Sequence, residues 1–131
     1  MKRRAYFVLA LTCLGLSAAV AETARAQDFM RGNFKQQSGE DLYKGVCQGC
    51  HMPDAKGAVG AGAYPALAGD IRLAQAIYPI AVVVNGQRGM PAFGDLLTDA
   101  QIALVLNFIR THFGNRFADA VQPEAVKAAR R

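Results

Sequence analysis

The spacing of apolar residues predicts a chain built from short helices. The clearest helix starts with a capping box, Thr-Asp-Ala-Gln at residues 98–101, and Gly114 ends it. Its apolar side repeats at helical spacing and consists of Ile102, Val105, Phe108 and Ile109. The sequence has no alternating strand pattern, internal repeat or low-complexity tract, so it predicts an all-α fold.

An earlier helix is predicted to begin at Ser38, with Asp41 three residues later as its capping partner. Its apolar side consists of Leu42, Tyr43 and Val46, and its end runs into a pair of cysteines. The residues before it, 27–37, are polar without a period and read as a loose lead-in. We therefore place the domain at residues 38–114 and a tail at 115–131.

The middle of the chain predicts loops and short helices. Residues 52–69, rich in glycine and alanine, show no period and predict a long loop. Asp70 is expected to cap a short helix that Pro79 interrupts, with a new helix from Pro79 to Val84 ended by Gly86. Residues 87–97 form a second loop.

The first 26 residues resemble a cleaved export signal. Three basic residues at 2–4 precede an uncharged, mostly apolar run at 5–21, and Ala24-Arg25-Ala26 offers a small-x-small cleavage site before Gln27. An uncleaved membrane anchor is the alternative, although the run is shorter than the ~20 residues of a spanning helix. The Arg3-Arg4 pair alone is a weak twin-arginine signal.

Cleavage would change the charge of the protein. The formal charge falls from +5 to +2, because four basic and one acidic side chains leave with residues 1–26. The remaining basic residues form no stripe, which excludes a nucleic-acid function. The one basic cluster, Lys127, Arg130 and Arg131, is expected to be part of a solvated tail.

Cysteine spacing indicates the chemistry. Cys13 lies in the export signal, so the mature chain keeps Cys47 and Cys50, followed directly by His51. Cys-x-x-Cys-His is the attachment pattern of haem c: each thiol can add to one vinyl group of the porphyrin, and the histidine can bind the iron. The alternatives are a redox-active cysteine pair and half of a zinc site. The first would open a helix after a strand in an α/β pattern, which is absent, and for the second, which needs four ligands in a closed geometry, the mature chain supplies only the two thiols, His51 and His112.

A second axial ligand must come from elsewhere in the chain. The candidates are Met30, Met52, Met90 and His112. Met52 adjoins His51 on the same side of the ring, so it cannot reach the opposite face, and Met30 lies in the polar lead-in. His112 lies in the last turn of the terminal helix, where a histidine facing the free carbonyls of the helix end is common. Met90, in a Gly-Met-Pro loop some forty residues downstream, is the predicted ligand, with a buried core methionine as the alternative.

With these residues in place, the mature chain resembles class I c-type cytochromes. It is most similar to the small monohaem cytochromes and cytochrome subunits that serve bacterial periplasmic dehydrogenases, through residues 64–69, 85–93, 97–103 and 107–110. The resemblance implies one haem c wrapped by short middle helices and loops, with the N- and C-terminal helices crossing at Gly39 and Tyr43. It also implies that the Pro65 carbonyl accepts a hydrogen bond from His51, although Pro65 could simply stiffen the loop. Arg88 could pair with a haem propionate or face solvent.

The expected function is electron transfer rather than catalysis. The protein is expected to be periplasmic, to take single electrons from a periplasmic dehydrogenase and to pass them to an oxidase or another cytochrome, meeting membranes only through partners. The alternatives are a permanently bound subunit of a dehydrogenase complex and a haem enzyme or gas binder with a labile sixth ligand.

Overall fold

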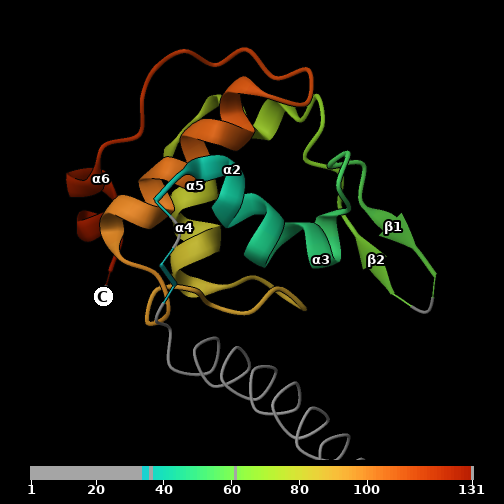
Figure 1. Cartoon of the computed structure of the whole chain (residues 1–131), viewed down its shortest axis with the longest axis horizontal. Helices are drawn as coiled ribbons and strands as arrows, with labels where there is room; N and C mark the ends of the chain where they lie inside the picture. The colour runs from blue at the N-terminus through green and yellow to red at the C-terminus, as the bar shows by residue number, and fades with distance from the viewer. Residues whose placement is uncertain (1–33, 36, 61, 131) are drawn as a thin grey trace, which may run out of the picture. The chain divides into compact units, whose positions relative to one another are not determined.

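A computed structural model of the chain describes residues 34, 35, 37–60 and 62–130 (Figure 1). The predicted export signal, Cys13, Met30 and Arg131 lie outside the described residues. In the part of the chain that is described, no helix is long and apolar enough to cross a membrane.

The first helical stretch passes through three consecutive elements: α2 (Gly39–Leu42), the π-helical η1 (Tyr43–Cys47) and α3 (Gln48–His51). Its start is the predicted one, since the Ser38 hydroxyl accepts a hydrogen bond from the Asp41 amide at 3.1 Å. Within η1 the Gln48 amide donates to the Tyr43 carbonyl, one residue further back than in an α-helix. This wider turn ends at Cys47, the first cysteine, so the irregular part of the helix leads into the motif.

The long helix α5 (Asp99–Thr111) also has the predicted ends. The Gln101 amide donates to the Thr98 hydroxyl at 3.2 Å, and the Thr98 amide donates to the Gln101 side chain at 3.0 Å, which completes the capping box. Gly114, with φ +82°, follows its last turn.

Helices α2 and α5 pack closely because the residue at their contact is glycine. A Cβ atom on Gly39 would lie 2.3 Å from the Leu104 carbonyl oxygen and 2.7 Å from the Phe108 Cβ, so no larger residue fits there. One turn along, the Tyr43 ring lies 5.9 Å from the Phe108 ring. The core around this contact is apolar and includes Leu42, Ile102, Val105 and Leu106.

The middle segment contains the 3₁₀-helix η2 (Ile71–Ala74) and helix α4 (Ile77–Asn85). Asp70 caps η2 as predicted, accepting from the Arg72 amide at 3.0 Å. Helix α4 starts two residues before the expected position, because Pro79 falls in its first turn, where a missing N–H costs nothing. Gly86, with φ +73°, ends α4 as predicted.

The glycine- and alanine-rich segment contains a small hairpin that the sequence did not predict. Strands β1 (Ala58–Val59) and β2 (Ala63–Tyr64) pair antiparallel, with Ala58 opposite Tyr64 and Val59 opposite Ala63. Two residues per strand are too few to produce a readable alternation. The described fold is therefore mostly helical with one short hairpin, rather than purely α.

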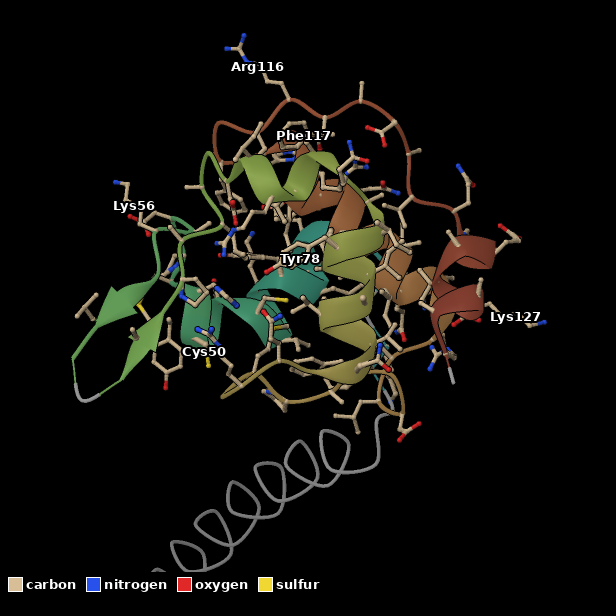
Figure 2. The ribbon with its side chains drawn as sticks, turned by 180° about the vertical axis from the view of Figure 1, so that it is seen from behind. Cys50, Lys56, Tyr78, Arg116, Phe117 and Lys127 are labelled. Atoms are coloured by element: carbon tan, nitrogen blue, oxygen red, sulfur yellow. The ribbon has the colours of Figure 1, made fainter. Side chains whose placement is uncertain are left out.

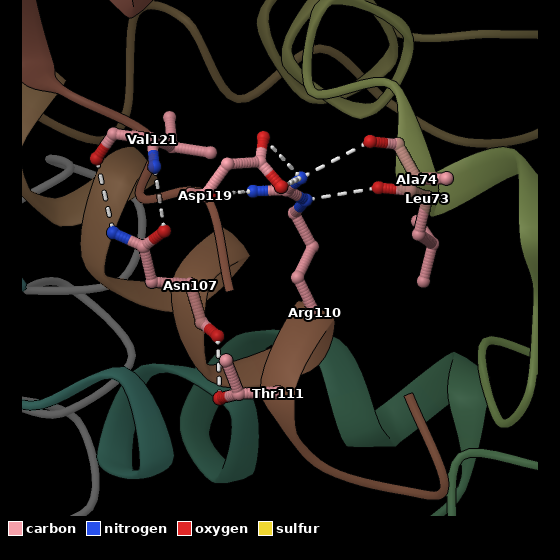
Figure 3. Close-up of polar contacts among 7 residues, drawn as sticks. All are labelled: Leu73, Ala74, Asn107, Arg110, Thr111, Asp119 and Val121. Carbon is pink, nitrogen blue, oxygen red and sulfur yellow. Dashed lines mark hydrogen bonds and ion pairs between the residues drawn. The ribbon is translucent and has the colours of Figure 1, made fainter. Parts of the chain in front are cut away.

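The C-terminal tail is a packed segment, which corrects the expectation that it is solvated. It ends in α6 (Pro123–Ala129), which packs against α4 and α5 and whose Val126 is fully buried (Figure 1). The Asn107 side chain of α5 bonds both the amide and the carbonyl of Val121, at 2.7 and 3.0 Å (Figure 3). Lys127, one of the two described residues of the predicted basic cluster, is exposed and points away from the domain (Figure 2).

Arg110 fixes the start of this tail. Its fully buried guanidinium donates to the carbonyls of Leu73 and Ala74 on η2 and to the carboxylate of Asp119, the last at 2.7 Å (Figure 3). The hydrogen bond from Arg110 lowers the pKa of the Asp119 carboxyl. One buried cation thus joins η2, α5 and the tail.

Candidate functional site

The two cysteines and the histidine of the motif lie on a single helical turn. Cys47 ends η1, and Cys50 and His51 end α3. Both thiols are free; Cys50 is exposed and Cys47 half-buried, whereas His51 is buried. The turn therefore presents two unpaired thiols three residues apart and one imidazole beside them.

The tautomer of His51 follows from its hydrogen bond. Its Nδ1 atom lies 2.9 Å from the Pro65 carbonyl oxygen. A carbonyl can only accept, so Nδ1 must carry the proton, and in the neutral ring Nε2 keeps a free lone pair. A metal-binding histidine requires this state, in which one nitrogen is held by a carbonyl and the other is free to coordinate.

Backbone hydrogen bonds hold Pro65 in place opposite His51. The Ala55 carbonyl accepts from the amides of Leu67 and Ala68 at 2.8 and 2.9 Å, and the Gly57 amide donates to the His51 carbonyl at 3.1 Å. Both ends of the hairpin segment are thereby attached next to the histidine. The loop predicted at 52–69 thus serves to position one carbonyl.

Burial raises the pKa of one group in the motif and of one group beside it. It raises the pKa of the Cys47 thiol to about 12, with a contribution from the Cys50 thiol. It also raises the pKa of the Tyr43 hydroxyl to about 12, with smaller contributions from Cys47 and Asp54. At neutral pH the environment of the motif therefore favours uncharged groups.

Met90 belongs to the loop between α4 and α5; Figure 1 shows the course of this loop. Its side chain is half-buried, and its amide and carbonyl exchange hydrogen bonds with those of Gln87, both at 3.0 Å. Next along the loop, the amides of Phe93 and Gly94 donate to the carbonyls of Val83 and Val84 at 2.9 and 3.1 Å. The loop is therefore a closed structure attached to the end of α4.

Gly86 makes this closure possible. Its φ of +73° disfavours other residues, and a Cβ atom there would lie 2.8 Å from both the Met90 carbonyl oxygen and the Ala92 amide nitrogen. The glycine that ends α4 is thus also the residue against which the Met90 turn folds back.

The remaining candidates have local explanations. His112 is exposed; its Nδ1 lies 2.9 Å from the Phe108 carbonyl oxygen and its ring stacks on the Phe108 ring at 4.2 Å. Met52 follows His51 directly, with φ +66°. Arg88 is exposed, and its side chain has no ion-pair partner among the described residues. In the same part of the chain, no three His, Cys, Asp or Glu side chains form a group that could hold a metal ion.

The site and the chain around it match known proteins. A sequence model of the family described as "Cytochrome C oxidase, cbb3-type, subunit III" matches residues 34–109, more than half of the chain. The chain belongs to the cytochrome c family. The cytochrome is also 36% identical over 111 residues to the fructose dehydrogenase cytochrome subunit of Gluconobacter japonicus. That match covers 73% of the cytochrome but only 22% of the relative, so the chain spans about a fifth of the relative's length.

The donor set of the cytochrome fits the haem c that its family implies. Two free thiols at Cys-x-x-Cys spacing suit two thioether bonds, and the free Nε2 lone pair of His51 suits iron. The fit rests on the residues themselves: a protonated Nε2 or a disulfide between Cys47 and Cys50 would have contradicted it.

Sequence reasoning missed the residues that join the tail of the cytochrome to its domain. Arg110, which also binds Asp119, donates to the Leu73 carbonyl, and Arg130 donates to the Leu97 carbonyl; both are contacts between segments far apart in sequence, which no local pattern reveals. One local signal was present: Pro123 at a first helical position, followed by Glu124, is typical of a helix start.

Proposed function

We propose that this cytochrome binds one haem c through Cys47, Cys50, His51 and Met90 and carries single electrons between periplasmic redox proteins. The observation that carries the proposal is the His51–Pro65 hydrogen bond, which leaves Nε2 free next to two free thiols. When bound, haem c supplies an iron that changes between the ferric and ferrous states. One electron lost by the donor is gained by the acceptor, and no bond to a substrate breaks.

Each site residue then has a distinct part. Cys47 and Cys50 hold the cofactor covalently, and Pro65 fixes the ring plane of His51 and raises its basicity as a ligand. Met90 would hold the iron through its thioether sulfur, a ligand that would raise the reduction potential and exclude a substrate from the iron. Arg88, exposed on the same loop, is the proposed partner of a haem propionate.

We propose a periplasmic dehydrogenase as the electron donor and an oxidase or another cytochrome as the acceptor. The relative's name, a dehydrogenase cytochrome subunit, supports the donor and also favours a second candidate, permanent attachment to one dehydrogenase. Gel filtration of a native periplasmic extract distinguishes them: a free carrier elutes near the 14.0 kDa of the chain or below, and a subunit co-elutes with the enzyme.

The proposal is tested with the purified holoprotein. Mass spectrometry should show one haem per chain, and the haem should be reduced by a dehydrogenase with its substrate and reoxidised by an acceptor. A haem that reacts with peroxide or binds carbon monoxide before any mutation would instead support the enzyme or gas-binder alternative.

A further inference from the structure

Arg130, at the end of α6, connects the tail to the base of the Met90 loop. Its Nε donates to the Asp99 carboxylate at 2.5 Å, its Nη2 donates to the Leu97 carbonyl at 2.9 Å, and its Nη1 donates to the Gly94 carbonyl. The side chain is 30% exposed, so a charged group lies mostly inside the protein with every nitrogen bonded. Such charge-assisted hydrogen bonds are stronger than neutral ones.

Gly94 is the point where three segments meet. Its amide bonds the Val84 carbonyl at the end of α4, and its carbonyl bonds Arg130 of the tail. The loop that begins at Gly86 is thus closed on one side by α4 and on the other by the tail. Because Gly94 lies four residues after Met90, a shift of this anchor moves the backbone that carries the thioether.

The geometry points to Arg130 as a positioning residue for Met90, one that keeps the methionine loop closed and so sets how firmly the sulfur holds the iron. This inference rests on the proposed function, in which Met90 is the axial ligand. Arg130 lies outside residues 34–109, the part of the chain that matches the family. Its contact with Gly94 therefore supports the methionine loop from a segment that the family match does not include.

The effect of Arg130 can be separated from the folding of the tail. Val126 and Val121 are buried, and Arg110 holds the preceding segment through Asp119. Helix α6 therefore keeps its own contacts when the Arg130 guanidinium is removed. What the protein loses is the donor to the Gly94 and Leu97 carbonyls.

The test uses the holoprotein of full length with Arg130→Gln, Arg130→Lys and the control Lys127→Ala, which removes an exposed charge from the same helix. The readouts are the methionine–iron charge-transfer band of the oxidised protein, the rate of cyanide binding and the reduction potential. Losing about one net charge-assisted hydrogen bond should speed cyanide binding about tenfold, the equivalent of ~1.4 kcal/mol. Arg130→Gln should also weaken the band and lower the potential, Arg130→Lys should lie between it and the parent, and Lys127→Ala should match the parent.

Two further variants decide between the explanations. Asp119→Ala loosens the tail at its other anchor; if it changes the band and cyanide rate as much as Arg130→Gln, general loosening explains the effect and the inference is wrong. Met90→Ala tests the proposed function itself. If Met90→Ala abolishes the band while Arg130→Gln leaves all three readouts unchanged, the positioning role fails alone; if Met90→Ala keeps the band, the ligand assignment fails.

Discussion

The Tyr43 hydroxyl donates a hydrogen bond to the Met52 carbonyl oxygen at 2.7 Å, which ties the first helical stretch to the residue after His51. Tyr43 also packs against Phe113, with ring centroids 4.9 Å apart. The same side chain therefore joins the attachment motif to the end of α5.

The Tyr43 hydroxyl should lose its proton at a higher pH than an ordinary tyrosine does. Burial raises its pKa to about 12, above the ~10 of an ordinary tyrosine, so the folded protein holds this proton more tightly than the unfolded chain. The resulting stabilisation is complete below pH 10 and is lost as the pH rises to about 12. Tyrosinate absorbance of the parent minus that of Tyr43→Phe should isolate this titration; a difference curve centred near pH 10 would contradict the burial argument.

Replacement of Met90 by alanine should leave one coordination position of the haem iron free. We expect the methionine–iron band to vanish, cyanide and carbon monoxide to bind, and the reduction potential to fall, because methionine ligation raises it. Met52→Leu is the control, since Met52 is fixed next to His51. If the band persists in Met90→Ala, Met90 is not the iron ligand and Met30 becomes the candidate to test.

Gly39 and Gly49 should respond to alanine in opposite ways. Gly39→Ala places a methyl group 2.3 Å from the Leu104 carbonyl oxygen and should destabilise the protein by ~1–3 kcal/mol, the usual cost of overpacking. Gly49→Ala meets no atom within 4 Å and should stabilise its helix by up to ~1 kcal/mol. Urea unfolding of both holoproteins measures the difference, and equal effects would mean that the helices α2 and α5 can move apart freely.

Electron transfer to this cytochrome should depend little on salt. We propose that partners dock on the surface formed by Cys47, residues 57–63 and residues 87–93, where electrons would pass to and from the haem. Arg88 is the one formal charge in these segments, and nearby Lys56 is paired with Asp54 at 3.3 Å. Between 0.1 M and 1 M salt the Debye length falls from ~10 Å to ~3 Å. Stopped-flow reduction by the native dehydrogenase should change less than about threefold, whereas strong steering would give tenfold or more.

The mature protein should begin at Gln27. Mass spectrometry of protein isolated from the periplasm is expected to show a chain starting there, in part as pyroglutamate, with one haem attached. A full-length chain recovered only from membranes would instead indicate that residues 5–21 act as an anchor.

Local patterns were sufficient to predict the starts of α2 and α5, the glycines that follow α4 and α5, and the attachment motif. The N-cap of Ser38, the capping box of Thr98 and the terminating glycines Gly86 and Gly114 depend on residues close in sequence, and the structure contains each of these ends. The predicted contact between His51 and Pro65 is also present, but it came from family resemblance rather than from spacing.

The errors arose where distant segments decide the structure. The basic residue Arg130 looked solvated because its partners Asp99, Gly94 and Leu97 lie more than thirty residues earlier. The hairpin was missed because its strands are only two residues long. It also depends on hydrogen bonds from the Leu67 and Ala68 amides to the Ala55 carbonyl, which hold the chain after β2 next to the chain before β1.

The shortness of that hairpin has a consequence for solubility. Val59 is 92% exposed, and an exposed apolar strand normally invites another chain to pair with its free edge. Strands β1 and β2 each offer only two residues, and Gly60 turns its amide inward to the Gly62 carbonyl at 2.8 Å. The tip of the hairpin can therefore present the large apolar side chain of Val59 to a partner. It has too few unpaired backbone N–H and C=O groups for another chain to add to it as a strand and aggregate.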